Sequence, residues 1–144
     1  MRHETMVLSA ALSLIGCAAT GPASSTEVRL NLYKTHSAPV ESFRITKLQG
    51  RQTRWSALGD QALMVWDESD QPILLELPQK CVGLATTKSV SITNATGTVT
   101  PGTDSVQLLA PSRAGSAYFC RIGSARRIDM GAVEKAQDEM RNSN

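Results

Sequence analysis

The chain has few aromatic residues and little net charge, and each shortage argues against a class of partner. Phe, Trp and Tyr together make up 4% of its 144 residues. Rows of aromatic side chains that stack on single-stranded nucleic acid are therefore not expected. The formal net charge of +2 is too small by itself to imply binding to a polyanion. The sequence predicts no nucleic-acid partner.

The usual motifs of catalysis are also missing. The sequence contains no His-Glu-x-x-His zinc motif, no glycine-rich phosphate loop and no dinucleotide-binding fingerprint. His36 is the only histidine beyond the N-terminal segment, and no serine stands in a nucleophile-elbow motif. Residues 67–70 lack the glycine and the distal glutamate of a calcium loop, so a solvated hairpin tip is the better interpretation. We expect a protein without enzymatic activity, metal or cofactor.

The N-terminal segment, residues 1–16, is typical of a lipoprotein signal peptide. Its apolar run, residues 6–15, is too short to span a bilayer and is followed by small residues. Residues 14–17, Leu-Ile-Gly-Cys, resemble a bacterial lipobox, in which Cys17 becomes the lipid-modified first residue of the mature protein. An ordinary signal peptide with an incidental cysteine is the alternative. We expect a lipid anchor at Cys17, a domain that faces the periplasm and, from Ala18 at the next position, outer-membrane sorting.

Residues 17–39 are predicted to be a tether and one short, ambiguous element. Residues 18–26 are small and polar and include glycine and proline, as in a flexible linker. Apolar residues alternate in residues 27–36 as they do in a strand, but Thr26 could cap a short helix, which we favour. Residues 37–39, Ser-Ala-Pro, should then break the segment.

Residues 40–128 are predicted to form a β domain organised around the strands in residues 51–77. Residues 62–66 are apolar on both faces of a strand and should be covered on both sides. The next strand, residues 73–77, should have one wetter face that carries Leu74 and Glu76. A last long strand should place three side chains on its inner face: Tyr118, Cys120 and Ile122.

The last segment, residues 129–144, changes period and predicts a C-terminal helix with a frayed tail. Asp129 is a suitable N-cap, and Val133, Ala136 and Met140 follow on one side. The fold class is therefore all-β, a small barrel or sandwich of about seven short antiparallel strands with this helix.

The three cysteines suggest one lipid site and one disulfide. If Cys17 carries lipid, Cys81 and Cys120 remain as a pair, and the oxidising periplasm permits a bridge between them. Such a bridge would stabilise the fold by roughly 4 kcal/mol. Two buried free thiols are one alternative. A metal or redox site is another, which the absence of a Cys-x-x-Cys motif and of a nearby histidine disfavours.

Basic residues near the C-terminus could form a binding surface for acidic lipid, glycan or protein. The alternative is a charged strand edge that discourages aggregation. Trp55 and Trp66 would be binding candidates if exposed, although so few aromatic residues more often lie in a core. The candidate basic surface consists of Arg113, Arg121, Arg126 and Arg127, with Lys80 as a further member.

Several short motifs, spread over residues 40–136, form a distinctive set together. They are Val-Glu-Ser-Phe at 40–43, Trp55 with Leu-Gly-Asp at 58–60, Val-Trp at 65–66, Leu-Leu-Glu-Leu at 74–77, Cys81, Val90 with Ile92, Asp-Ser-Val at 104–106, Cys-Arg-Ile at 120–122 and Arg-Ile-Asp at 127–129. With this set the chain resembles a family of small proteobacterial envelope proteins of unknown function, many of them predicted lipoproteins. Ile73, where that family tends to have an aromatic residue, is a mild departure. The resemblance supports the disulfide and the envelope location, and it implies no activity.

These observations lead to one main hypothesis and one alternative. The main hypothesis is a non-catalytic envelope lipoprotein whose small β domain binds another periplasmic or outer-membrane component. The alternative is a periplasmic inhibitor or immunity protein that blocks a toxin or hydrolase.

Overall fold

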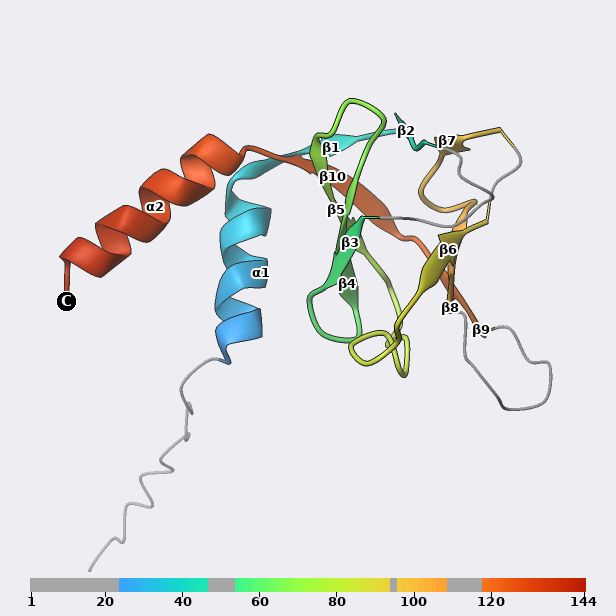
Figure 1. Cartoon of the computed structure of the whole chain (residues 1–144), viewed down its shortest axis with the longest axis horizontal. Helices are drawn as coiled ribbons and strands as arrows, with labels where there is room; N and C mark the ends of the chain where they lie inside the picture. Colours follow the sequence, from blue (N-terminus) through green and yellow to red (C-terminus); the bar gives the residue numbers. More distant parts are fainter. Residues whose placement is uncertain (1–23, 47–53, 94–95, 109–117) are drawn as a thin grey trace, which may run out of the picture.

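The computed structural model describes residues 24–46, 54–93, 96–108 and 118–144 (Figure 1). Within these ranges the chain forms ten strands in three antiparallel sheets, together with two helices. The predicted β-rich class with a C-terminal helix is therefore confirmed, but the described strands outnumber the predicted seven or so, and their three sheets do not close into a barrel. Residues 1–23, which include the predicted signal peptide and Cys17, lie outside the described residues.

The largest sheet has five strands and the other two are smaller. In spatial order the five-stranded sheet contains β1 (Ser37–Val40), β10 (Ser124–Ile128), β5 (Pro72–Glu76), β4 (Ala62–Trp66) and β3 (Trp55–Ala57). The three-stranded sheet contains β6 (Val90–Ile92), β8 (Ser105–Leu108) and β9 (Tyr118–Arg121), and the two-stranded sheet contains β2 (Phe43–Arg44) and β7 (Thr98–Val99). The helices are α1 (Ser25–Thr35) and α2 (Met130–Asn142), and Figure 1 shows both on the side of the five-stranded sheet away from β6, β8 and β9.

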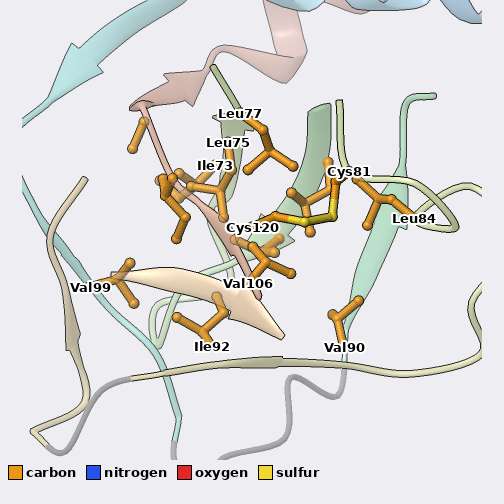
Figure 2. Close-up of a cluster of buried hydrophobic side chains, with 14 of the residues drawn as sticks. Ile73, Leu75, Leu77, Cys81, Leu84, Val90, Ile92, Val99, Val106 and Cys120 are labelled. Carbon is orange, nitrogen blue, oxygen red and sulfur yellow. A yellow bond between two sulfur atoms is a disulfide. The ribbon is translucent and has the colours of Figure 1, made fainter. Parts of the chain in front are cut away.

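Strand β4 is buried on both faces, as its sequence predicts. Leu63 and Val65 belong to the larger core cluster, which the five-stranded sheet shares with the two smaller sheets (Figure 2). Ala62 and Met64 point the other way, into a smaller cluster shared with the helices. Successive side chains of a strand point to opposite faces, so one apolar strand supplies both cores.

The prediction that the next strand, β5, has a wetter face is wrong. Leu74 in β5 is fully buried, because Tyr33 of α1 and Val133 of α2 cover that face of the sheet. Strand β5 is thus the middle strand of the five-stranded sheet, with β10 on one side and β4 on the other. Glu76 on the same face is half-buried and pairs with Lys34 of α1 at 2.8 Å.

The ambiguous element is a helix, as favoured, although its cap differs from the expected one. Ser24, rather than Thr26, is the N-cap of α1, and it forms a reciprocal capping box with Glu27. The helix ends at Thr35, so the predicted break at residues 37–39 is confirmed, and these residues then begin β1. Strand β1 pairs only with β10 among the described strands, and an edge strand tolerates Pro39 since its missing N–H need not serve two neighbours.

The predicted long strand through Ile122 is in fact two strands in different sheets. The chain leaves the three-stranded sheet after β9 and enters the five-stranded sheet as β10, with Gly123 at the junction. The N–H of Gly123 donates to the carbonyl oxygen of Glu76 at 2.8 Å. A Cβ atom at Gly123 would lie 3.0 Å from Cδ of Pro78, so this close crossing favours a residue without a side chain.

The C-terminal helix forms as its sequence predicts. Asp129 is the N-cap of α2 and accepts a hydrogen bond from the N–H of Ala132 at 3.0 Å. Val133 is buried against the sheet, whereas Met140 in the last turns is 46% exposed. The helix therefore docks through its first half.

Candidate functional site

A disulfide joins the two inner cysteines, as the sequence predicts. The Sγ atoms of Cys81 and Cys120 are 1.96 Å apart and their Cα atoms are 5.8 Å apart. Both residues belong to the larger core cluster (Figure 2). Cys81 follows β5 after a short turn and Cys120 lies within β9, so the bridge holds the turn at residues 78–80 beside β9.

A pocket of about 390 Å³ lies between this turn and β9. Residues 78–80 line one side of the pocket, and residues 118–121 of β9 line the other. Phe119 is 57% exposed and Tyr118 is 45% exposed, and the side chains of Lys80 and Arg121 beside them are also exposed. We call the four residues Lys80, Tyr118, Phe119 and Arg121 the β9 surface.

Strand β9 is an edge strand, with β8 as its only partner among the described strands. The N–H of Ile122 donates to the carbonyl oxygen of Asp104 at 3.0 Å, whereas Ser105 accepts from Thr93 on the other side of β8 at 2.9 Å. Main-chain groups of successive residues point to opposite edges of an antiparallel strand. The main-chain groups of Phe119 and Arg121 therefore point away from β8, toward the open edge.

The structure does not bring the predicted arginine surface together. Arg113 lies outside the described residues. Arg126 donates from Nε to Oγ of Ser37 at 2.8 Å and from Nη2 to the carbonyl oxygen of Ser37 at 3.1 Å, which fastens β10 to β1. Arg127 lines a different pocket from Arg121 and binds the carboxylate of a turn residue. Of the four arginines, Arg121 is the one that belongs to the β9 surface.

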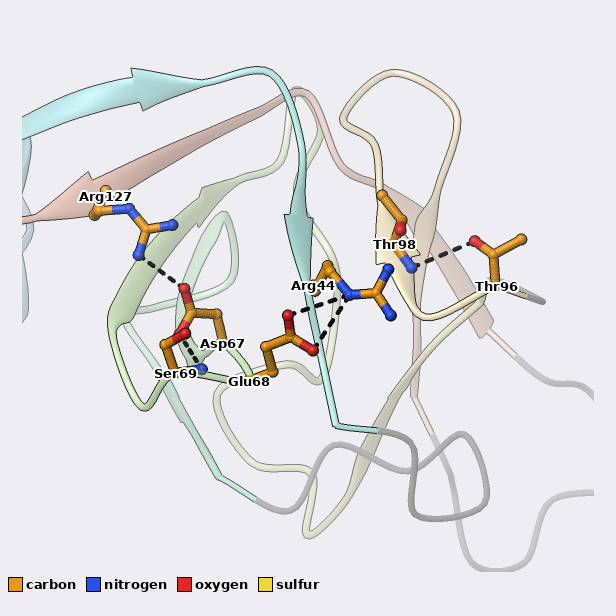
Figure 3. A network of polar contacts seen from close by, with 7 residues as sticks. All are labelled: Arg44, Asp67, Glu68, Ser69, Thr96, Thr98 and Arg127. Atoms are coloured by element: carbon orange, nitrogen blue, oxygen red, sulfur yellow. Dashed lines mark hydrogen bonds and ion pairs between the residues drawn. The ribbon is translucent and has the colours of Figure 1, made fainter.

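The carboxylate that binds Arg127 is Asp67, at the start of the β4–β5 turn (Figure 3). Its Oδ2 accepts from Nη1 of Arg127 at 2.7 Å, and its Oδ1 accepts from the N–H groups of Ser69 and Gln71, each at 2.9 Å. Burial of its side chain, which is 6% exposed, acts to raise the pKa. The hydrogen bonds from Gln71, Arg127 and Ser69, together with the positive charge of Arg127, outweigh burial and hold the pKa of Asp67 below its ordinary value.

The same turn carries two further ion pairs on the protein surface. Arg44 of β2 contacts Glu68 at 3.2 Å (Figure 3), and Arg54 pairs with Asp70. The guanidinium of Arg54 also lies 4.2 Å from the ring centroid of Trp66. The exposed hairpin tip thus also carries ion pairs to other segments of the chain, although such surface pairs contribute little stability.

The tryptophans are not the exposed aromatic residues of this protein. Trp55 packs against the larger core cluster and Trp66 against the smaller one. The predicted inner-face position of Tyr118 is wrong, because its side chain is 45% exposed. Sequence reasoning also missed Phe119, which is exposed because it alternates with the inward-facing Cys120. The period-two pattern around Cys120 was the signal that could have found it.

Asp60 and His36 form hydrogen bonds that connect parts of the fold. Asp60 accepts a hydrogen bond from the N–H of Ala85 at 3.2 Å, and the carbonyl oxygen of His36, the C-cap of α1, accepts from Asp129 at 2.8 Å. Within the described ranges no three His, Cys, Asp or Glu side chains lie close enough together to hold a metal ion. In the same ranges no helix has the length and apolar character needed to cross a membrane.

The fold and the candidate site together define a small, disulfide-bonded β domain in which the open edge of β9 lies beside a pocket. The chain belongs to the family of unknown function DUF6491, which it matches over residues 1–144. This confirms the resemblance to an uncharacterised family. No curated protein and no solved structure matches the chain.

Proposed function

We propose that this protein is a non-catalytic lipoprotein of the bacterial cell envelope whose β domain binds a protein partner through the β9 surface. The observation that carries the proposal is the grouping of two exposed aromatic side chains and two cations around a pocket. Tyrosine and arginine are enriched among the residues that dominate binding energy in protein interfaces. Large exposed apolar side chains next to polar ones are typical of such interfaces.

The disulfide supports this role because it fixes the surface before a partner arrives. Cys120 lies between Phe119 and Arg121, and Cys81 directly follows Lys80. A surface that is already ordered loses less conformational entropy on binding than a flexible one. The bridge therefore favours affinity as well as stability.

The lipobox at residues 14–17 supports the anchor at Cys17. Six residues separate Cys17 from Ser24, the N-cap of α1. At about 3.6 Å per residue, a chain of that length reaches roughly 25 Å. The lipid would thus keep the domain near the membrane surface while leaving its far side free for a partner. Intact-mass measurement of the mature protein should show an acylated Cys17, and a Cys17→Ala variant should lose membrane association.

A capture experiment with matched variants tests the binding surface. The tagged, full-length protein is cross-linked in cells and recovered from detergent-solubilised membranes. The partner recovered with the wild type should be lost with Phe119→Ser and kept with Met140→Ser, which removes a similarly exposed apolar side chain from α2. Equal recovery with both variants would refute the β9 surface as the binding site. Recovery of a secreted toxin or hydrolase would replace the resident envelope partner with the inhibitor alternative.

A further inference from the structure

We infer that the open edge of β9 binds an extended, acidic peptide segment, which adds to the three-stranded sheet as a further strand. The inference rests on the proposed function and specifies how the β9 surface would recognise its partner. Strand addition is a common mode of peptide recognition, in which main-chain hydrogen bonds supply affinity and side-chain pockets supply specificity.

The main chain of β9 is the first feature that favours strand addition. The N–H and C=O groups of Phe119 and Arg121 point away from β8, as the hydrogen bonds of Ile122 and Ser105 on the two edges of β8 establish. No described strand pairs with this edge. Unpaired edges are templates for further strands, and natural proteins usually cover or disrupt those they do not use. Here the edge is bordered by a pocket.

The pocket is the second feature that favours strand addition. It extends along all four residues of β9, Tyr118–Arg121, and its opposite wall is the turn at residues 78–80. A strand laid along this edge would send alternate side chains to opposite faces of the sheet. Tyr118 and Phe119 point to opposite faces in the same way, so each set would pass one aromatic ring, and an apolar side chain fits beside the ring of Tyr118.

The positive charge around the pocket is the third feature, and it favours an acidic ligand. Lys80 and Arg121 line the pocket, and none of the described residues that line it is acidic. Lys80 forms an ion pair with Asp60, but the distance from Nζ to Oδ2 is 3.9 Å, a long contact for a side chain that is 69% exposed. A carboxylate on the added strand could therefore bind both cations, and Arg121 offers it a bidentate donor.

The test uses two capped eight-residue peptides with the full-length protein in detergent micelles. One peptide alternates glutamate and valine, and the other alternates lysine and valine. The acidic peptide, followed by fluorescence anisotropy, should bind at least about tenfold more tightly than the basic one, and added salt should reduce this preference. Arg121→Glu should reverse the preference. Arg29→Glu, a matched charge reversal at an exposed position of α1, should leave it unchanged.

Hydrogen exchange separates strand addition from binding by side chains alone. The amides of Phe119 and Arg121 should gain protection when the acidic peptide binds, whereas the amide of Cys120, which points toward β8, should change little. Equal binding of the two peptides, no binding of either, or binding without protection at these two amides would overturn the inference. If a partner is still captured in a Phe119-dependent way, the proposed function survives that result. Loss of the Phe119 dependence would instead remove the proposed function itself.

Discussion

The Cys81–Cys120 disulfide should contribute a large share of the stability of this domain. The two cysteines are 39 positions apart in the sequence. In the chain-entropy model, closing a loop of about 40 residues lowers the entropy of the unfolded chain by roughly 13 cal/mol/K, or about 4 kcal/mol at 25 °C. Single domains are typically stable by about 5–15 kcal/mol. Reduction of the disulfide should therefore remove a large share of the free energy of unfolding, although it removes no heavy atom from the protein.

Urea unfolding of the oxidised and the reduced protein measures this contribution. For a typical urea m-value of about 2 kcal/mol/M, a loss of about 4 kcal/mol lowers the midpoint by about 2 M. Trp55 and Trp66 report on the larger and the smaller core cluster respectively. If each tryptophan is monitored in a variant that lacks the other, coincident transitions would show that the two cores unfold together.

A control and a threshold make the disulfide prediction refutable. A variant with both Cys81→Ala and Cys120→Ala should be insensitive to reductant, so any residual effect of the reductant is not the disulfide. A stability loss below about 1 kcal/mol in the wild type would contradict the entropic argument. It would mean that other contacts already restrict the unfolded chain, or that β9 does not depend on the bridge for its position.

Three further predictions concern single side chains in the sheets and α2. Asp67→Asn should lower the free energy of unfolding by about 1–3 kcal/mol at pH 7, since it weakens the charged hydrogen bond to Arg127. Because folding lowers the pKa of Asp67 below its ordinary value of 3.8, the stability it contributes is complete above that pH and is lost as the pH falls through the folded pKa; denaturation curves that stay separated in acid would contradict this. Gly123→Ala should destabilise by about 1–3 kcal/mol through the contact with Pro78. Gly131→Ala, the same change in the first turn of α2 with only ordinary contacts, should be neutral or stabilise by up to about 1 kcal/mol; equal thermal shifts for the two glycines would refute the crowding argument. Leu74→Ala should cost about 2–5 kcal/mol in urea unfolding, as for a fully buried leucine, and a cost below 1 kcal/mol would mean that the helices do not seal that face.

Local patterns predicted the parts of the fold that local forces determine. Residues 62–66 have no polar side chain on either face, so a doubly covered strand followed directly. Asp129 before an amphipathic run predicted α2. By contrast, the cover over Leu74 comes from Tyr33 and Val133. These residues are distant in sequence, and no pattern within β5 reveals which face they occupy.

The alternation of apolar residues changes at Gly123, where the chain passes from one sheet to another. The sequence analysis assumed a single continuous alternation and missed this change. Ile122 and Ala125 both point into the larger core cluster, yet they are three positions apart. A continuous strand would place them on opposite faces. The shift in the alternation of inward-facing residues around Gly123 therefore indicated two strands rather than one.

Two of the predicted surface arginines, Arg126 and Arg127, have structural partners that the sequence alone did not reveal. Arg126 binds Ser37, 89 positions away, and Arg127 binds Asp67, 60 positions away. Both partners become neighbours only through the order β1, β10, β5 and β4. Charge alone could not separate these arginines from Arg121, whose strand lies at a sheet edge.

The proposed anchor and the proposed binding surface are compatible because they belong to opposite ends of the domain. The tether from Cys17 enters at α1, and Figure 1 places α1 and α2 on the side away from β9. A lipid at Cys17 would therefore hold the helices toward the membrane, and the open edge of β9 would face the periplasm. Three connections fix that edge on the domain: the ladder with β8, the bridge from Cys120 to Cys81 and the crossing at Gly123. Because two of these three lie within the short span from Cys120 to Gly123, stability and recognition depend on the same few residues.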